Sequence, residues 1–71
     1  MRMPLTMATQ GETYVIQRIT GKDETKHFLK NLGFLVGECV TVISEIGGNV
    51  IIRIKESRIA LDKNMANRIL V

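Results

Sequence analysis

Apolar and polar residues alternate along several short stretches of the chain, and this alternation predicts β-strands. A strand places successive side chains on opposite faces, so apolar residues at every second position indicate one buried face. The predicted strands cover residues 12–19, 39–43, 50–55, 58–61 and 69–71. Five short strands favour a small closed β-barrel, because closure removes the exposed strand edges through which sheets aggregate.

The phase of the alternation predicts which strand side chains fill the barrel. In the first stretch both faces carry apolar residues, as expected for a barrel whose outside is partly covered. In the later stretches one face is consistently apolar. Val40, Val42, Ile59 and Leu61 are expected to point inward, and Val50, Ile52 and Ile54 share one face of their strand.

One segment has the spacing of a helix instead. Residues 24–32 carry Phe28, Leu29 and Leu32 at positions i, i+1 and i+4, a stripe that predicts packing against the barrel. This places one short α-helix in the first crossover, between the first two strands. Residues 62–67 are expected to form a single helical turn before the last strand.

Polar residues and glycines mark the connections between these elements. Asp23 is expected to cap the helix through its carboxylate, and Gly33 to end it in the left-handed conformation. Gly11 and Gly37 are expected in turns. Residues 45–49 predict a hairpin, because the paired glycines supply positive φ angles.

Length and composition predict one small globular domain spanning residues 1–71. The chain has 71 residues, of which 45% are hydrophobic and 24% charged, with a formal net charge of +3. Nearly all of this apolar surface is needed to offset the conformational entropy of folding, so no large buried catalytic cavity can be accommodated. We therefore expect that the chain is not an enzyme.

Cysteine content and hydropathy predict a cytoplasmic protein. The single cysteine, Cys39, cannot form an intramolecular disulfide, which favours a reducing compartment. The longest aliphatic or aromatic runs, residues 34–36 and 50–52, are far shorter than the ~20 residues of a membrane-spanning helix. Neither export nor membrane insertion is expected.

Metal-binding and catalytic constellations are not visible in the sequence. His27 and Cys39 are the only imidazole and thiolate donors, and they stand twelve positions apart, so no metal site or cofactor is expected. Nucleophilic catalysis would require a base beside Ser44 or Ser57 that is held by a third group. No catalytic residue is assigned.

The basic residues raise the question of nucleic-acid binding. Ten Lys and Arg residues stand against seven Asp and Glu, but only three aromatic side chains are available to stack on bases, so nucleic acid is not expected as the partner. Lys22, Lys26 and Lys30 recur every four residues and predict one stripe along the helix. This stripe either docks an acidic partner or only solvates the helix.

Three blocks of residues resemble one known family. The central block, Leu-Lys-Asn-Leu-Gly-Phe at residues 29–34 with Gly37, is similar to the pattern Leu-x-x-Leu-Gly-Phe/Ile-x-Pro-Gly. The outer blocks are Leu5 with Gly11-Glu12, and Ile59-Ala60-Leu61 with Ala66 and residues 69–71. The chain thus resembles the FeoA family, small SH3-like barrel proteins of bacterial ferrous iron transport.

The resemblance implies structural roles for the central block. Leu29 and Leu32 would seat the helix over the barrel, Gly33 would end it, and Phe34 would plug the barrel mouth. Val36 stands where the family usually has proline, and the turn at Gly37 is expected to survive this change.

The resemblance also implies a function. The chain would be a cytoplasmic accessory to the ferrous-iron transporter FeoB, contacting its GTP-binding portion or cytoplasmic face without carrying iron or hydrolysing GTP. The resemblance implies transition-metal binding only as a property associated with the family, and no residue of this chain is assigned to it. The residues expected to form the partner contact are Lys26, His27, Phe28, Lys30 and Asn31, together with Leu35 and Val36.

Two other functions remain open. The same barrel resembles the SH3-like domain of iron-dependent repressors, but this chain has no helix-turn-helix module and would act alone. A nucleic-acid-binding barrel is the second alternative, and it predicts association that weakens steeply with salt.

Overall fold

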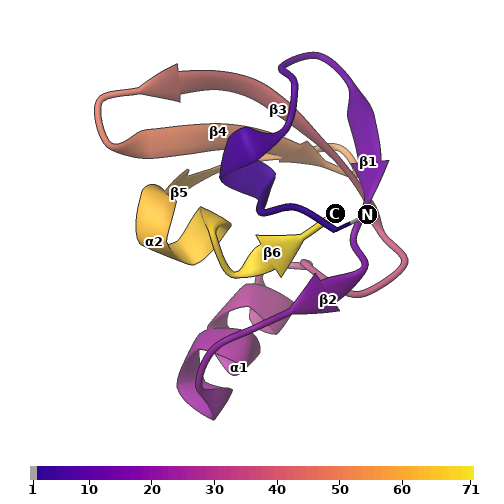
Figure 1. Ribbon diagram of the computed structural model, residues 1–71, viewed down its shortest axis with the longest axis vertical. Helices are drawn as coiled ribbons and strands as arrows, with labels where there is room; N and C mark the ends of the chain where they lie inside the picture. Colours follow the sequence, from indigo (N-terminus) through magenta and orange to yellow (C-terminus); the bar gives the residue numbers. More distant parts are fainter. Residues whose placement is uncertain (1) are drawn as a thin grey trace.

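The computed structural model describes residues 2–71 and contains two antiparallel sheets (Figure 1). The larger sheet has the strand order β1-β3-β4-β5, and the smaller one pairs β2 with β6. The strands are β1 (Thr13–Val15), β2 (Arg18–Ile19), β3 (Cys39–Ile46), β4 (Asn49–Ile54), β5 (Ser57–Asp62) and β6 (Ile69–Leu70). The helices are the 3₁₀ turn η1 (Leu5–Met7), α1 (Asp23–Asn31) and α2 (Lys63–Ala66).

The single strand predicted over residues 12–19 is two strands that belong to different sheets. The chain passes from one sheet to the other at Ile16, whose N–H donates to the Glu38 carbonyl at 2.9 Å. Gln17 then donates to the Leu70 carbonyl at 2.8 Å, beside β6. Ile16 is fully buried at this corner. The described chain therefore has six strands, and the mainly β class with one main helix is confirmed.

The core lies between the two sheets and beneath α1. The predicted inward positions on β3 and the shared apolar face of β4 are confirmed, as is Leu61 on β5. Ile59 is only partly buried but packs against the same cluster. The buried residues are Leu5, Ile16, Leu29, Phe34, Val40, Val42, Val50, Ile52, Ile54, Leu61, Ala66, Ile69 and Val71.

Tight turns join β3 to β4 and β4 to β5. The first is the predicted hairpin, with Gly47 at a φ of 60°, and β3 extends to Ile46 instead of ending at residue 43. The pairing of β3 with β4 shifts by one residue between Val42 and Ser44, which marks a β-bulge in β3. In the second turn Lys55 has a φ of 54°, a left-handed conformation that costs a non-glycine residue roughly 1 kcal/mol.

Helix α1 is fixed more firmly at its end than at its start. It begins at Asp23, so the predicted capping role of this residue was wrong: the N-cap is Lys22, without a side-chain hydrogen bond. Instead the Asp23 carboxylate stands in the first turn, where the helix dipole favours negative charge.

At the C-terminus of α1 the chain closes in a Schellman motif. Gly33, at a φ of 103°, donates its N–H to the Lys30 carbonyl at 2.9 Å. Phe34 donates its N–H to the Leu29 carbonyl at 3.0 Å, and both side chains are buried in the core. Gly33 thus has the left-handed conformation expected of the residue that ends the helix. Of the two leucines expected to seat the helix, Leu29 is fully buried and Leu32 is half-buried.

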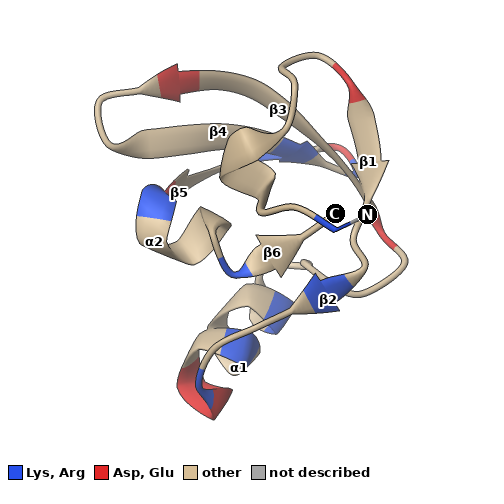
Figure 2. Ribbon diagram, in the orientation of Figure 1, with Lys and Arg blue, Asp and Glu red and all other residues tan. Residues whose placement is uncertain are grey.

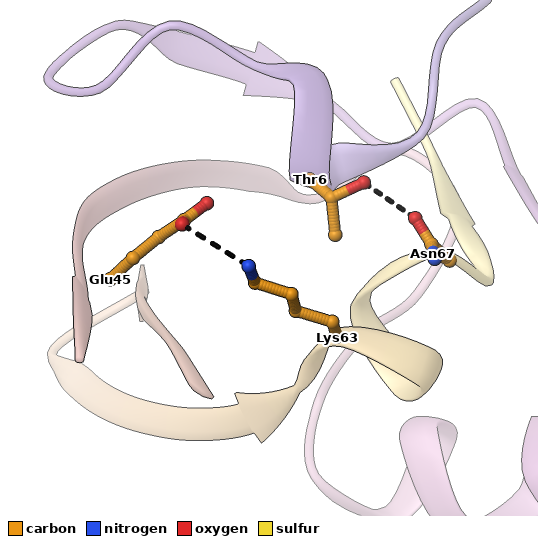
Figure 3. A network of polar contacts seen from close by, with 4 residues as sticks. All are labelled: Thr6, Glu45, Lys63 and Asn67. Carbon is orange, nitrogen blue, oxygen red and sulfur yellow. Dashed lines mark hydrogen bonds and ion pairs between the residues drawn. The ribbon is translucent and has the colours of Figure 1, made fainter. Parts of the chain in front are cut away.

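Polar contacts attach the N-terminal turn η1 and the first hairpin to α2 (Figure 3). The Thr6 hydroxyl donates to the Asn67 side-chain carbonyl, and the Lys63 ammonium lies 3.7 Å from a carboxylate oxygen of Glu45. Asp62 caps α2 by accepting the Met65 N–H at 2.8 Å. The helical turn predicted near residues 62–67 is thus confirmed.

The two ends of the described chain run side by side. Met3 and Val71 exchange two backbone hydrogen bonds of 2.9 Å each, and Pro4 forms a β-bridge with Leu70. Figure 1 shows both ends at the same side of the molecule, next to the smaller sheet.

Candidate functional site

The outward side of α1 carries most of the residues expected to contact a partner. Lys26, His27 and Lys30 are exposed, and together with Asp23 they line a shallow hollow of about 190 Å³. These four residues are spaced at i, i+3, i+4 and i+7, so they form one ridge on the helix. Figure 2 shows the acidic start of α1 followed by its basic residues.

The cations of this ridge have no intramolecular carboxylate partner within the described chain. The ion pairs formed by residues 2–71 join Lys55 in the β4–β5 turn to Glu38 just before β3, and Lys63 on α2 to Glu45 on β3. Neither Lys26 nor Lys30 takes part in one, so both ammonium groups are available to an acidic partner.

Phe28 lies on the opposite flank of the helix from the lysines. At 3.6 residues per turn, it is displaced about 160° around the axis from both Lys26 and Lys30. Its side chain is 48% exposed, so the expectation that it packs against the barrel was wrong, and within α1 only Leu29 is fully buried. The geometric reason is that Leu29 points directly at the core, so Phe28, about 100° away around the helix axis, lies at the edge of the contact between α1 and the core.

Asn31 connects the two flanks. It is exposed and follows His27 by four positions and Phe28 by three, so it is a neighbour of both on the helix surface. The residues expected to form one contact therefore divide into a basic flank (Lys26, His27 and Lys30) and an apolar flank that starts at Phe28, with Asn31 between them.

Leu35 and Val36 belong to a turn that follows α1. Glu38 donates its N–H to the Leu35 carbonyl at 3.0 Å, and Gly37 has a φ of 94°, as the third residue of a type II turn requires. The turn predicted at Gly37 is thus present despite the valine that precedes it. Leu35 is 38% exposed and Val36 is 66% exposed.

Val15 adds an apolar side chain near this turn that the sequence analysis did not assign to the contact. Gly37 donates its N–H to the carbonyl of Ile16 at 2.9 Å, which holds the turn against the end of β1. Val15 precedes Ile16 and is 44% exposed. The sequence signal for this exposure is the two-residue alternation of β1, which places Val15 on the same outward face as Thr13.

The described residues offer little to a metal ion or a nucleophilic reaction. Within residues 2–71 no three His, Cys, Asp or Glu side chains lie close enough together to hold a metal ion. Cys39 is free and exposed at the start of β3. The surface of α1 and the following turn instead combines exposed cations with exposed apolar side chains.

Comparison with known proteins identifies relatives of the whole chain. Residues 3–71 match the model of the FeoA domain. A protein of Methanocaldococcus jannaschii, named as a candidate Fe(2+) transport protein A, is 32% identical over 68 residues, which cover 96% of this chain and 83% of the relative.

Solved structures agree with this match. The crystal structure of an iron uptake regulatory protein, FeoA, superposes with a TM-score of 0.88 at 26% identity, over 99% of this chain and 93% of that one. A zinc complex of FeoA from Stenotrophomonas maltophilia, described as an SH3 domain protein, superposes with a TM-score of 0.82 at 23% identity, over 94% and 86% of the two chains. The predicted SH3-like fold is therefore confirmed.

Proposed function

The chain belongs to the FeoA family, and on this basis we propose that it is a cytoplasmic accessory protein of ferrous iron transport that binds a FeoB-type GTPase-transporter. The observation that carries this proposal is the family match over residues 3–71, which includes the whole described core. The names of the relatives, an Fe(2+) transport protein and an iron uptake regulatory protein, support the same process. Ferrous iron is the cargo of that process.

The accessory role is also consistent with what the fold presents to solvent. In the part of the chain that the structure describes, no helix is long and apolar enough to cross a bilayer. Most large apolar side chains pack in the core or against it, and Phe28, Leu35 and Val36 are among those that remain exposed. We infer that this protein acts through contacts made by its surface, while transport and GTP hydrolysis take place on its partner.

The surface of α1 and the turn after it is the proposed contact. Lys26 and Lys30 would attract an acidic region of the transporter and orient the encounter. Phe28, Leu35 and Val36 would supply apolar area, and burial of the exposed half of the Phe28 side chain would contribute about half of the roughly 1.5–3 kcal/mol that full burial of a phenylalanine provides. A difference of about 1–3 kcal/mol in affinity between two transporter states is enough to regulate it.

Titration of the chain into the cytoplasmic GTP-binding part of the transporter tests both the partner and the surface. The variant Lys26→Glu/Lys30→Glu is expected to bind about tenfold or more weakly, because it reverses both cations of the basic flank. Arg18→Glu/Arg68→Glu is the matched control, since it changes the net charge equally at two exposed arginines outside α1. Equal affinities for the helix variant and the wild type would contradict the proposed surface, and absence of binding by the wild type would contradict the partner.

A second pair of variants tests the apolar flank separately. Phe28→Ala is expected to weaken binding about tenfold, because a partly exposed aromatic ring would be buried in the complex. Ile46→Ala, at the tip of the β3–β4 hairpin and 66% exposed, is the control for loss of an exposed apolar side chain elsewhere. If both substitutions changed the affinity equally, Phe28 would contribute no specific contact, and the proposed contact would be limited to the basic flank.

A further inference from the structure

The larger sheet ends in a strand whose outer edge pairs with no other strand of residues 2–71. β5 lies at the edge of the order β1-β3-β4-β5 and pairs with β4 from Ile54↔Ser57 onward. The two residues that flank a two-residue hairpin loop form a hydrogen-bonded pair, which here is Ile54↔Ser57. Hydrogen-bonded and non-hydrogen-bonded pairs then alternate along the two strands. The N–H and C=O groups of Arg58 and Ala60 therefore point away from β4, toward solvent.

These groups remain free for an external strand. No hydrogen bond of residues 2–71 outside the strand pairings involves the backbone of Arg58 or Ala60, and both residues are exposed. Four backbone groups on a short, uncovered edge can be satisfied by water or by an added strand.

Two arginines stand beside this edge on the outer face of the sheet. Arg53 on β4 is paired directly with Arg58 on β5, and both are exposed. They continue a row across all four strands, in which Thr13 pairs with Thr41 and Thr41 pairs with Arg53. Because Arg53↔Arg58 is a non-hydrogen-bonded pair, their Cα atoms are only about 4.5 Å apart.

This pair is not neutralised by an ion pair with any carboxylate of residues 2–71. Like charges directly opposite each other destabilise a sheet. The nearest cation along the chain, Lys55, is already engaged with Glu38 at 3.5 Å. Two adjacent guanidinium groups provide the forked donors that bind carboxylates bidentately.

From these two features together we propose that the edge of β5 binds an extended acidic peptide segment of a protein partner, which adds a strand to the larger sheet. The peptide backbone would pair with Arg58 and Ala60. A carboxylate directly opposite Arg58 would lie on the outer face within reach of Arg53 as well. The small side chain of Ala60 leaves room for the next side chain of the peptide on that face.

A protein segment fits this surface better than a nucleic acid. Proteins that bind single strands use aromatic side chains as stacking platforms beside the charge. Here the three aromatic residues are elsewhere: Phe34 is in the core, Tyr14 packs against it, and Phe28 is on α1. The open strand edge, in addition, matches a peptide backbone and not a phosphodiester.

The test uses the isotope-labelled chain and a synthetic probe, the blocked peptide Thr-Glu-Thr-Glu-Thr-Glu, followed by amide NMR signals. We expect the largest shifts at Arg58 and Ala60 and slower hydrogen exchange of these two amides as the peptide is added. The peptide in which lysine replaces glutamate should produce neither effect. Equal responses to both peptides, or shifts confined to α1, would overturn the proposal.

Two variants separate charge from strand addition. Arg53→Gln/Arg58→Gln should weaken peptide binding about tenfold, while the control Arg18→Gln/Arg68→Gln, with the same net charge, should bind as the wild type does. Ala60→Pro removes one outward N–H without removing a bond to β4 and should abolish binding although both arginines remain. Undiminished binding by Ala60→Pro would overturn strand addition.

A nucleic-acid probe completes the comparison. Single-stranded oligothymidine is expected to bind more weakly than the acidic peptide at the same salt concentration. Tighter binding of the oligonucleotide at Arg53 and Arg58 would overturn the assignment of a protein partner and would identify the face as a nucleic-acid surface.

Discussion

Helix α1 and the outer face of the larger sheet both present cations, but they arrange them differently. On α1 the basic residues Lys26 and Lys30 are one turn apart and share their hollow with the carboxylate of Asp23. On the sheet Arg53 and Arg58 are directly opposite each other, and neither forms an ion pair with the carboxylates of the described chain. Neither Lys26 nor Lys30 forms an ion pair either, so the two surfaces differ in arrangement: the lysines share a hollow with a carboxylate, whereas the arginines face each other as like charges.

The chemistry of the two surfaces differs accordingly. Lysine carries a compact, strongly hydrated charge on a flexible stem, which suits attraction and orientation of a partner. Arginine presents planar, fixed donors that suit a defined carboxylate geometry. The first surface is thus suited to a folded acidic partner with an apolar contact at its side, and the second to an extended segment.

The largest expected effect concerns the attachment of α1 to the core. Phe34→Ala removes the buried ring that follows the helix and should lower the free energy of unfolding by about 3–5 kcal/mol. Urea unfolding followed by circular dichroism measures this loss. Phe28→Ala is the control, and because its ring is half-exposed we expect a change within about 0.5 kcal/mol.

Similar losses for the two phenylalanines would show that Phe28 stabilises the fold as much as Phe34 does, and would contradict its assignment to a binding surface. A loss below about 1 kcal/mol for Phe34→Ala would show that the Schellman motif alone holds the helix end.

A smaller effect concerns the turn beside the helix. Val36→Pro should raise the free energy of unfolding by about 0.4–1 kcal/mol, because Val36 occupies the position of a type II turn that proline favours. The Val36 N–H donates none of the backbone hydrogen bonds that fix this turn. Thermal or urea unfolding measures the gain, and Val36→Ala, which leaves φ unrestricted, should show none. Destabilisation by proline would mean that the φ of Val36 is incompatible with the ring.

The smallest effect concerns the arginine pair. Arg58→Glu should stabilise the chain by about 0.2–1 kcal/mol, because it replaces a repulsive cross-strand pair with an attractive one. The gain should shrink in about 1 M NaCl, where charges on the surface are screened. Arg18→Glu is the control, since Arg18 is paired with Leu70. Equal gains in the free energy of unfolding from both substitutions would show that the effect comes from net charge. No gain from Arg58→Glu would show that the side chains of Arg53 and Arg58 point apart and do not repel each other measurably.

Much of the fold could be predicted because its signals are local. The two-residue period of β3 and β4 identified Val40, Val42 and Ile52 as buried, and the glycine after α1 identified the end of the helix. The strand over residues 12–19 was predicted wrongly because a transfer between two sheets depends on partners distant in sequence. Ile16 turns inward at that transfer, and the alternation alone does not show it.

The candidate site divides in the same way. The lysine ridge follows from helical spacing and was visible in the sequence, whereas the exposure of Phe28 depends on how α1 rests on the core. The arginine pair was not visible, because residues 53 and 58 become neighbours only through the register of β4 and β5. The involvement of these residues in binding a partner remains a prediction.

The pairing of the chain ends has a consequence for how this fold can be used within larger proteins. Since Met3 and Val71 are joined by two backbone hydrogen bonds, the chain enters and leaves the domain at almost the same point. Such a domain can be inserted into a surface loop of another protein without stretching the host. For the same reason a short linker joining the two ends, with a new opening at Gly47-Gly48, should yield a circular permutant with the same core.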